Sequence, residues 1–189
     1  MNIGVCMIIA YFPPIVGGTE TQTLSLARAL ITQNVNPSVI TERVRGLKRF
    51  ERIDGVPVYR LLTLGSGTFA SLSFMLSSFH FLMKNRRKYQ IIPAHLASSP
   101  AITATIAGKL LRKKIVVKFG GAGKTGDIQT SHRTFLGRIK LKFLMKYVDI
   151  FICPSEEMKE ELINYGFAKG KVVKIPNGVD IVLFHPVDD

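Results

Sequence analysis

The chain has 189 residues, enough for one domain with a hydrophobic core, and 47% of them are hydrophobic. Its mean hydropathy of +0.22 excludes a disordered chain, because disordered chains are poor in apolar residues. The formal net charge of +13 suggests an anionic partner, either nucleic acid or an acidic membrane surface. No nucleic-acid recognition motif accompanies the charge, so no nucleic-acid partner is predicted. A third explanation is that another part of a longer protein balances the charge.

A strand, a turn and a helix open the chain. The apolar run from Ile3 to Ile9 predicts a strand buried on both faces, and residues 19–34 place their apolar residues on one helical face. Gly17 and Gly18 lie in the turn where the helix begins, so its free N–H groups could receive an anion close to the backbone. The alternative is a tight turn with Thr19 as the helix cap. This stretch alone favours neither interpretation.

The following elements alternate between strands and helices, which predicts an α/β fold with a Rossmann-like parallel sheet and helices on both faces. A hairpin about Asp54-Gly55 is indicated, because this dipeptide tolerates the positive φ of a tight turn. Ser155 is the predicted N-cap of a late helix that ends at Gly166. Helices are predicted over 19–34, 68–88, 100–111, 134–147 and 155–166, and strands over 3–9, 37–41, 50–62, 89–94, 115–119, 148–153 and 172–175.

Residues 1–175 are predicted to form one domain, and residues 176–189 to begin a linker toward a further domain. Cys6 and Cys153 lie in apolar runs, so we expect reduced core residues of a cytoplasmic protein rather than a disulfide framework or a zinc site. The N-terminal apolar run lacks a basic leader, and the apolar stretch 69–83 is too short to span a bilayer. No signal peptide and no integral membrane segment are predicted.

A glycine-rich loop covers residues 120–126. Gly123-Lys124-Thr125 resembles the end of a P-loop, but the first glycine of that motif would fall at Lys118. Gly121, Gly123 and Gly126 fit a dinucleotide-binding pattern, yet no helix is predicted to open at Gly126, so this indication is weak. The favoured interpretation is that Lys118 and the loop N–H groups line the carboxyl edge of the sheet and face a polar or anionic substrate.

His95 follows the strand 89–94 and precedes Ser98-Ser99-Pro100. A lone histidine is more often structural, but its place at the carboxyl edge of the sheet makes a functional role about equally probable. No Asp or Cys stands nearby in the sequence, so a catalytic triad is not supported.

The helix 134–147 carries apolar residues on two sides. We expect one apolar stripe on it, with Leu141 and Met145 on the far side and a basic row between them. Phe74 and Phe81 are similarly expected to lie off the main stripe of helix 68–88. Such surfaces suit an anionic membrane, and packing against neighbouring loops or another domain is an alternative of at least equal weight. The stripe is Phe135, Ile139, Phe143 and Tyr147, and the basic row is Arg138, Lys142 and Lys146.

Four motifs, taken in chain order, resemble the N-terminal domain of the family-4 retaining glycosyltransferases, which have the two-domain GT-B fold. The last motif is the most specific and marks the passage between the two domains in that family, which makes Asn177, Gly178 and Asp180 hinge candidates. The motifs are Pro13-Pro14-x-x-Gly17-Gly18-x-Glu20, His95 after its strand, Ser155-Glu156 opening a late helix, and Ile175-Pro176-Asn177-Gly178-Val179-Asp180 with Phe184-x-Pro186.

The resemblance implies transfer of a sugar from a UDP- or GDP-linked donor to a glycan or lipid-linked acceptor, with retention of anomeric configuration. It implies no metal and no cofactor, and it is consistent with peripheral association with a membrane. Gly17, Gly18, Thr19 and Glu20 would approach the donor diphosphate, and His95 would line the cleft near the transferred sugar as the catalytic candidate. The candidates for acceptor binding are Ser98, Ser99, Lys118, Gly120 and Gly121.

The family's Glu-x7-Glu pair and its basic diphosphate clamp belong to the second domain, which this chain does not contain. We therefore expect the chain alone to be inactive in sugar transfer. The competing hypothesis is a non-catalytic module that docks its basic face on an anionic membrane or a partner.

Overall fold

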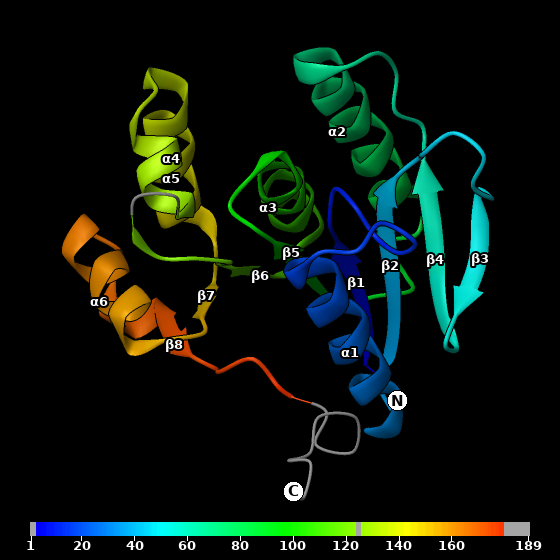
Figure 1. Cartoon of the computed structure of the whole chain (residues 1–189), viewed down its shortest axis with the longest axis horizontal. Coiled ribbons are helices and arrows are strands. Elements are labelled where there is room, and N and C mark those ends of the chain that lie inside the picture. The colour runs from blue at the N-terminus through cyan, green and yellow to red at the C-terminus, as the bar shows by residue number, and fades with distance from the viewer. Residues whose placement is uncertain (1–2, 124–125, 180–189) are drawn as a thin grey trace, which may run out of the picture.

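The computed structural model describes residues 3–123 and 126–179, which form one sheet flanked by helices (Figure 1). Within these residues the strand order is β3-β4-β2-β1-β5-β6-β7-β8. All neighbouring pairs are parallel except β3 and β4, so the predicted α/β class with a Rossmann-like sheet is confirmed. The strands are β1 Gly4–Ile8, β2 Asn36–Glu42, β3 Phe50–Ile53, β4 Val56–Leu61, β5 Ile91–His95, β6 Lys114–Lys118, β7 Ile150–Cys153 and β8 Val172–Lys174.

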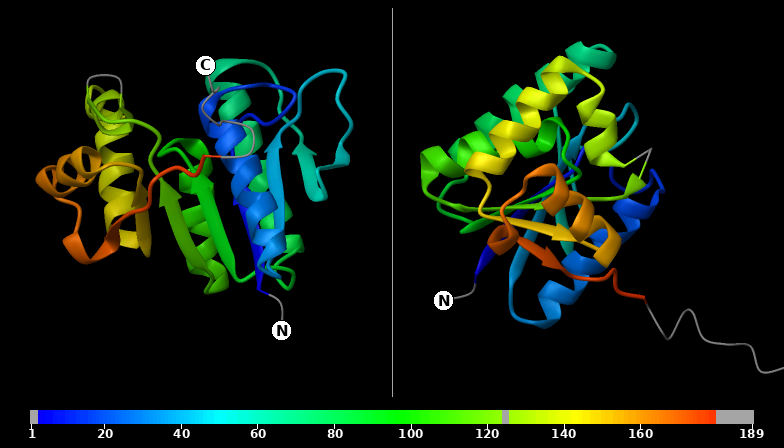
Figure 2. Two further views of the ribbon diagram at one scale, coloured as in Figure 1. Left: turned by 60° about the horizontal axis from the view of Figure 1, so that its bottom comes forward. Right: turned by 90° about the vertical axis from the view of Figure 1, so that its left-hand side faces the viewer.

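Helices cover both faces of the sheet (Figure 2). A large core cluster joins the sheet to α2, α3, α5 and α6, and a smaller one joins it to α1. Since both faces are covered, every residue of β1 is buried, as the continuous apolar run predicts. The helices are α1 Gly18–Thr32, α2 Gly67–Lys84, α3 Ser99–Leu111, α4 Asp127–His132, α5 Phe135–Tyr147 and α6 Glu156–Tyr165.

At three places the turns and helix caps in the structure are those predicted from the sequence. The β3–β4 hairpin turns through Asp54 (φ +49°) and Gly55 (φ +82°), both in the left-handed region. The Ser155 hydroxyl accepts a hydrogen bond from the Met158 N–H at 3.2 Å, and Gly166 ends α6 at φ +114°. These predictions are confirmed.

Helix α2 ends at Lys84, so the prediction that it continues to Lys88 is wrong. Asn85 terminates the helix by donating its side-chain amide to the Phe81 carbonyl at 3.0 Å. The Tyr89 hydroxyl, buried beyond the basic turn, donates to the Leu82 carbonyl at 2.7 Å and fixes the return toward β5. The basic residues 86–88 therefore lie in a turn and not on a helix.

The expected burial of α5 is also wrong. Leu141, assigned to the far side, is fully buried together with Leu144, whereas Phe135 and Ile139 of the expected stripe are exposed. With apolar residues on two sides, the helix gives no sequence signal for which side meets the core. Gly137 lies on the buried side, where an added Cβ would be 2.0 Å from the Ser131 carbonyl oxygen. Phe74 of α2, likewise expected off the main stripe, is completely buried.

Candidate functional site

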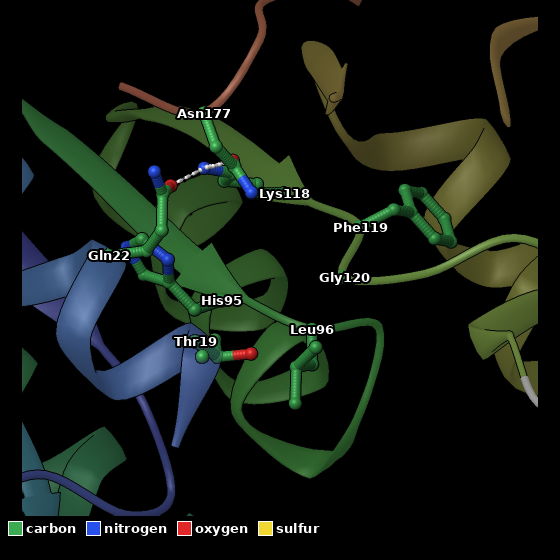
Figure 3. A pocket seen from close by; sticks show the side chains of 9 residues that line it. Thr19, Gln22, His95, Leu96, Lys118, Phe119, Gly120 and Asn177 are labelled. Atoms are coloured by element: carbon green, nitrogen blue, oxygen red, sulfur yellow. Dashed lines mark hydrogen bonds between the residues drawn. The ribbon is translucent and has the colours of Figure 1, made fainter. Parts of the chain in front are cut away.

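A pocket of about 210 Å³ opens at the carboxyl edge of the sheet, where β1, β5 and β6 end (Figure 3). In the sheet, β1 lies between β2 and β5. The chain continues from β1 to β2 on one side, and from β5 to β6 on the other side. The pocket therefore lies at the topological switch point, where open α/β sheets bind ligands. Its lining residues are Gly18, Thr19, Gln22, His95, Leu96, Lys118, Phe119, Gly120 and Asn177.

The N-terminus of α1 forms one wall of the pocket. The N-cap is Gly17, whose position has no side-chain cap, so the alternative that Thr19 caps the helix is wrong. A Cβ on Gly18 would meet no atom within 4 Å, which leaves the backbone of the first turn open on that side. The Glu20 carboxylate instead fills the space beside Gly17, 2.2 Å from where a Cβ would stand. Glu20 is thus the acidic residue that compensates the helix dipole from behind Gly17, and the N–H groups of the first turn without a side-chain cap could receive an anion on the open side of Gly18.

His95 is the last residue of β5 rather than the first residue after it, and only 2% of its surface is exposed. Neither ring nitrogen has a hydrogen-bond partner among the described residues. Burial, and next the charge of Lys118, lower the pKa of His95 to about 3, so the imidazole is neutral at pH 7. A neutral ring can donate a hydrogen bond from one nitrogen and accept one at the other, which suits a ligand hydroxyl.

Lys118 at the end of β6 joins three parts of the chain that are far apart in sequence. Its ammonium donates to the side-chain oxygen of Asn177 at 2.7 Å and to that of Gln22 on α1. Burial lowers the pKa of Lys118. Both partners are neutral amides, and no Asp or Glu stands among the residues that line the pocket within the described chain. The Lys118 ammonium therefore gives the pocket a positive charge, beside the first turn of α1.

The glycine-rich loop is tied to carboxylates of the protein itself. The Gly120 N–H donates to Asp127 at 2.8 Å, and the Gly123 N–H donates to Glu161 at 3.0 Å. Burial raises the pKa of Asp127, which takes further backbone hydrogen bonds from Ala97 and Gly121. At these positions the expectation that the loop N–H groups face a substrate is therefore not met.

Helix α4 begins at Asp127 directly after Gly126, so the expectation that no helix opens there is wrong. An acidic residue in the first turn compensates the helix dipole and starts this short helix without a long apolar pattern in the sequence. Lys124 and Thr125, which complete the P-loop resemblance, lie outside the described residues.

The pocket unites six of the residues singled out in the sequence, namely Gly18, Thr19, His95, Lys118, Gly120 and Asn177. Ser98 and Ser99 lie where α3 begins, and Asp180 lies outside the described residues. Three residues that line the pocket, Gln22, Leu96 and Phe119, were not predicted from the sequence. Of these, only Gln22 could have been predicted, because it follows Thr19 by three residues and therefore lies on the same side of the helix. The singled-out residues that do not line the pocket are Gly17, Glu20, Ser98, Ser99, Gly121 and Gly178.

Comparison with known proteins identifies a family. The family model described as Glycosyltransferase Family 4 matches residues 16–183. No curated protein sequence matches the chain.

Several solved structures share the fold. HepE from Anabaena, solved in complex with UDP-glucose, matches with a TM-score of 0.71 at 16% identity over 96% of this chain and 46% of its own. Sucrose-phosphate synthase from Thermosynechococcus elongatus matches with a TM-score of 0.73 at 17% identity over 98% of this chain and 51% of its own. UDP-GlcNAc 2-epimerase from Methanocaldococcus jannaschii matches with a TM-score of 0.62 at 15% identity over 94% of this chain and 46% of its own. The chain thus spans about half the length of each of these structures.

Proposed function

The chain belongs to glycosyltransferase family 4, and we propose that it forms the acceptor-side half of the cleft in a retaining hexosyltransferase. The observation that carries the proposal is the pocket at the switch point, which combines the open N-terminus of α1, the Lys118 ammonium and the neutral His95. A second domain, joined through the segment that begins at residue 176, would supply the nucleotide site. Family membership favours this proposal over a non-catalytic docking module.

The α1 N-terminus and Lys118 would stabilise the charge that develops on the diphosphate as it leaves the sugar. Gly18 matters because the space beside its Cα is open, so phosphate oxygens can approach the backbone N–H groups. Gly17 and Glu20 would support this turn from behind, because the Glu20 carboxylate packs beside Gly17 and leaves the pocket free.

His95 would hydrogen-bond a hydroxyl of the transferred sugar and hold it in position for attack by the acceptor. Its burial keeps the imidazole neutral, so it adds no charge that competes with Lys118 for the diphosphate. Closure of the second domain would exclude water, whose attack would hydrolyse the donor. The Lys118–Asn177 hydrogen bond links this motion to the pocket, because Asn177 lies in the segment that leads to the next domain.

For the donor we propose a UDP-linked sugar first and a GDP-linked sugar second. The similarity to HepE, which was solved with UDP-glucose, supports this order. For the acceptor we propose a glycan or a lipid-linked sugar, bound at the side of the pocket formed by Gly120 and Lys118, with Ser98, Ser99 and Gly121 nearby in the chain.

The proposal is tested by sugar transfer with a protein that joins this chain to its second domain. His95→Asn keeps a small polar side chain at the site but changes the hydrogen-bond geometry, and we expect it to lower kcat at least 100-fold in protein that a circular-dichroism spectrum shows to be folded. The matched control is His80→Asn on the exposed side of α2, which should leave kcat unaltered. Near-normal turnover of the His95 variant would assign that residue a structural role and contradict the proposed cleft.

A further inference from the structure

We propose that Asp127 of α4 is a positioning residue for the pocket, because its carboxylate ties the turn that follows β5 to the turn that follows β6. Asp127 itself does not line the pocket, so it would act through the residues that do. The inference rests on the proposed function and deepens it, since the two strands that these turns follow end at His95 and Lys118.

One carboxylate receives backbone N–H groups from both turns. The Gly120 N–H donates to Asp127 at 2.8 Å, and the N–H groups of Gly121 and Ala97 donate to the same carboxylate. Ala97 belongs to the turn after β5, and the two glycines belong to the turn after β6. A carboxylate offers about four acceptor positions, which is enough for all three donors. The paired register of β5 with β6 ends at the last residue of each strand, so Asp127 joins the two turns beyond it.

The turn after β5 contains a strained residue that needs such support. Leu96 has φ +70°, in the left-handed region, where the Cβ of a residue other than glycine crowds the following carbonyl. Such a conformation persists only where the surrounding structure enforces it. The Leu96 N–H donates to the Lys118 carbonyl at 2.8 Å, and the next N–H, that of Ala97, donates to Asp127. These two hydrogen bonds therefore hold the strained residue directly beside His95.

The two turns touch each other through Leu96 and Gly120, which both line the pocket (Figure 3). A Cβ on Gly120 would lie 2.5 Å from Leu96 Cδ2, 3.7 Å from the Asp127 carboxylate and 3.8 Å from Thr19 Oγ1. The first turn of α1, the start of α4 and the turns after β5 and β6 thus meet at this glycine. Because the Leu96 side chain lies directly on the Gly120 backbone, a shift of either turn would change the pocket wall beside His95.

The other role open to Asp127 is compensation of the α4 dipole, which an acidic residue in the first turn provides. That role requires a negative charge but no contact with other elements, whereas the three N–H donors all lie outside α4. Burial raises the pKa of Asp127, while these donors and the charge of Lys140 on α5 oppose this and favour the carboxylate. The contacts with other elements are what distinguish a positioning role from dipole compensation.

Sugar transfer by a protein that joins this chain to the proposed second domain tests the inference. In Asp127→Asn, an NH2 group that cannot accept a hydrogen bond replaces one of the two carboxylate oxygens at nearly unchanged size. We expect kcat to fall about 100-fold, because a displacement of about 1 Å at the reacting groups is sufficient for such a loss. The KM for the donor should change much less, since the proposed diphosphate contacts remain. A structural role alone would lower the melting temperature and leave the kcat of folded protein unaltered, which would overturn the inference.

The matched control is Asp149→Asn. The Asp149 carboxylate likewise accepts a backbone N–H, that of Ile115 at 2.9 Å, but it lies before β7 at the amino edge of the sheet. We expect this variant to lose stability without a loss of kcat. An equal loss of kcat in the two variants would overturn the inference, because it would show a general loosening of the sheet.

A double-mutant cycle with Leu96→Gly tests whether Asp127 acts through the strained turn. Glycine adopts the left-handed conformation without steric cost, so the turn depends less on enforcement. In this background we expect Asp127→Asn to lower kcat by about tenfold or less, since residues that act through one turn are not additive. The same fold-loss in both backgrounds would contradict an action through Leu96.

Amide hydrogen exchange of the wild-type chain decides the matter if the Asp127 variant does not fold. The Ala97, Gly120 and Gly121 amides should exchange at least about tenfold more slowly than unprotected amides, and unprotected exchange would overturn the inference. A wild-type two-domain protein without transfer activity would contradict the proposed function, and the role of Asp127 in transfer would fall with it. Normal kcat in Asp127→Asn, beside an impaired His95→Asn variant, would overturn this inference alone.

Discussion

Burial of a neutral His95 predicts that the folded protein loses stability on mild acidification. An unfolded chain binds a proton at this histidine below its ordinary pKa of about 6.5, whereas the folded protein does not do so until the pH approaches 3. Between these values the unfolded state holds one proton more. The His95 contribution to the unfolding free energy is therefore fully present above pH 6.5 and falls as the pH decreases.

The magnitude follows from the width of this window. One proton difference changes the unfolding free energy by about 1.4 kcal/mol per pH unit. Between about pH 7 and about pH 4.5 the histidine then accounts for a loss of about 2.5 kcal/mol. Asp127 and Glu42, whose pKa values are raised by burial, work in the opposite direction, because the folded state holds their protons more tightly. A comparison with a variant that lacks only the imidazole removes these other groups from the result.

Urea unfolding of the wild type and of His95→Gln at several pH values measures the effect. We expect the wild type to lose about 2.5 kcal/mol more than the variant over this range, whatever stability the variant has at pH 7. Parallel losses in the two proteins would refute a neutral, buried His95. NMR titration of the imidazole in the wild type gives the same answer if the variant does not fold: a ring that becomes protonated near pH 6.5 contradicts the structure.

Three further predictions concern packing, the pocket and a cap. Gly137→Ala should lower the unfolding free energy by about 2 kcal/mol or more, because its Cβ would overlap the Ser131 carbonyl, whereas Gly18→Ala, with open space beside it, should stay within about 0.5 kcal/mol by urea unfolding. Lys118→Met should weaken pyrophosphate binding at least tenfold by calorimetry with little change in stability, and undiminished affinity would remove Lys118 from the site. Ser155→Ala should cost about 1 kcal/mol, and an unchanged thermal midpoint would contradict its capping role.

Most of the fold could be predicted because local rules and global packing agree along most of the chain. The continuous apolar run before Pro13 specifies a central strand, Asp54-Gly55 specifies a hairpin, and Ser155 and Gly166 bound a helix. The wrong prediction for α5 has a physical cause. Helix α5 is apolar on two sides, so the pattern alone does not select the buried one, and the close approach of Gly137 to Ser131 of α4 on that side depends on how the two helices pack.

The candidate site was predictable where residues end strands or begin helices. His95, Lys118, Gly18 and Gly120 occupy such positions, and parallel strands bring their carboxyl ends to one edge. The hydrogen-bond partners of these residues were not predictable, because they belong to segments that are distant in the sequence. Thus Lys118 meets Asn177 across 59 positions, and Asp127 rather than a substrate accepts the Gly120 N–H.

The measurement that tests the central claim most directly is sugar transfer by a protein that joins this chain to the proposed second domain. UDP- and GDP-linked sugars would be screened with a membrane-lipid extract as acceptor. The account predicts product from one donor class, with the anomeric configuration retained, and no product from residues 1–189 alone. Folded two-domain protein that transfers no sugar from any donor, or the isolated chain turning over by itself, would contradict it.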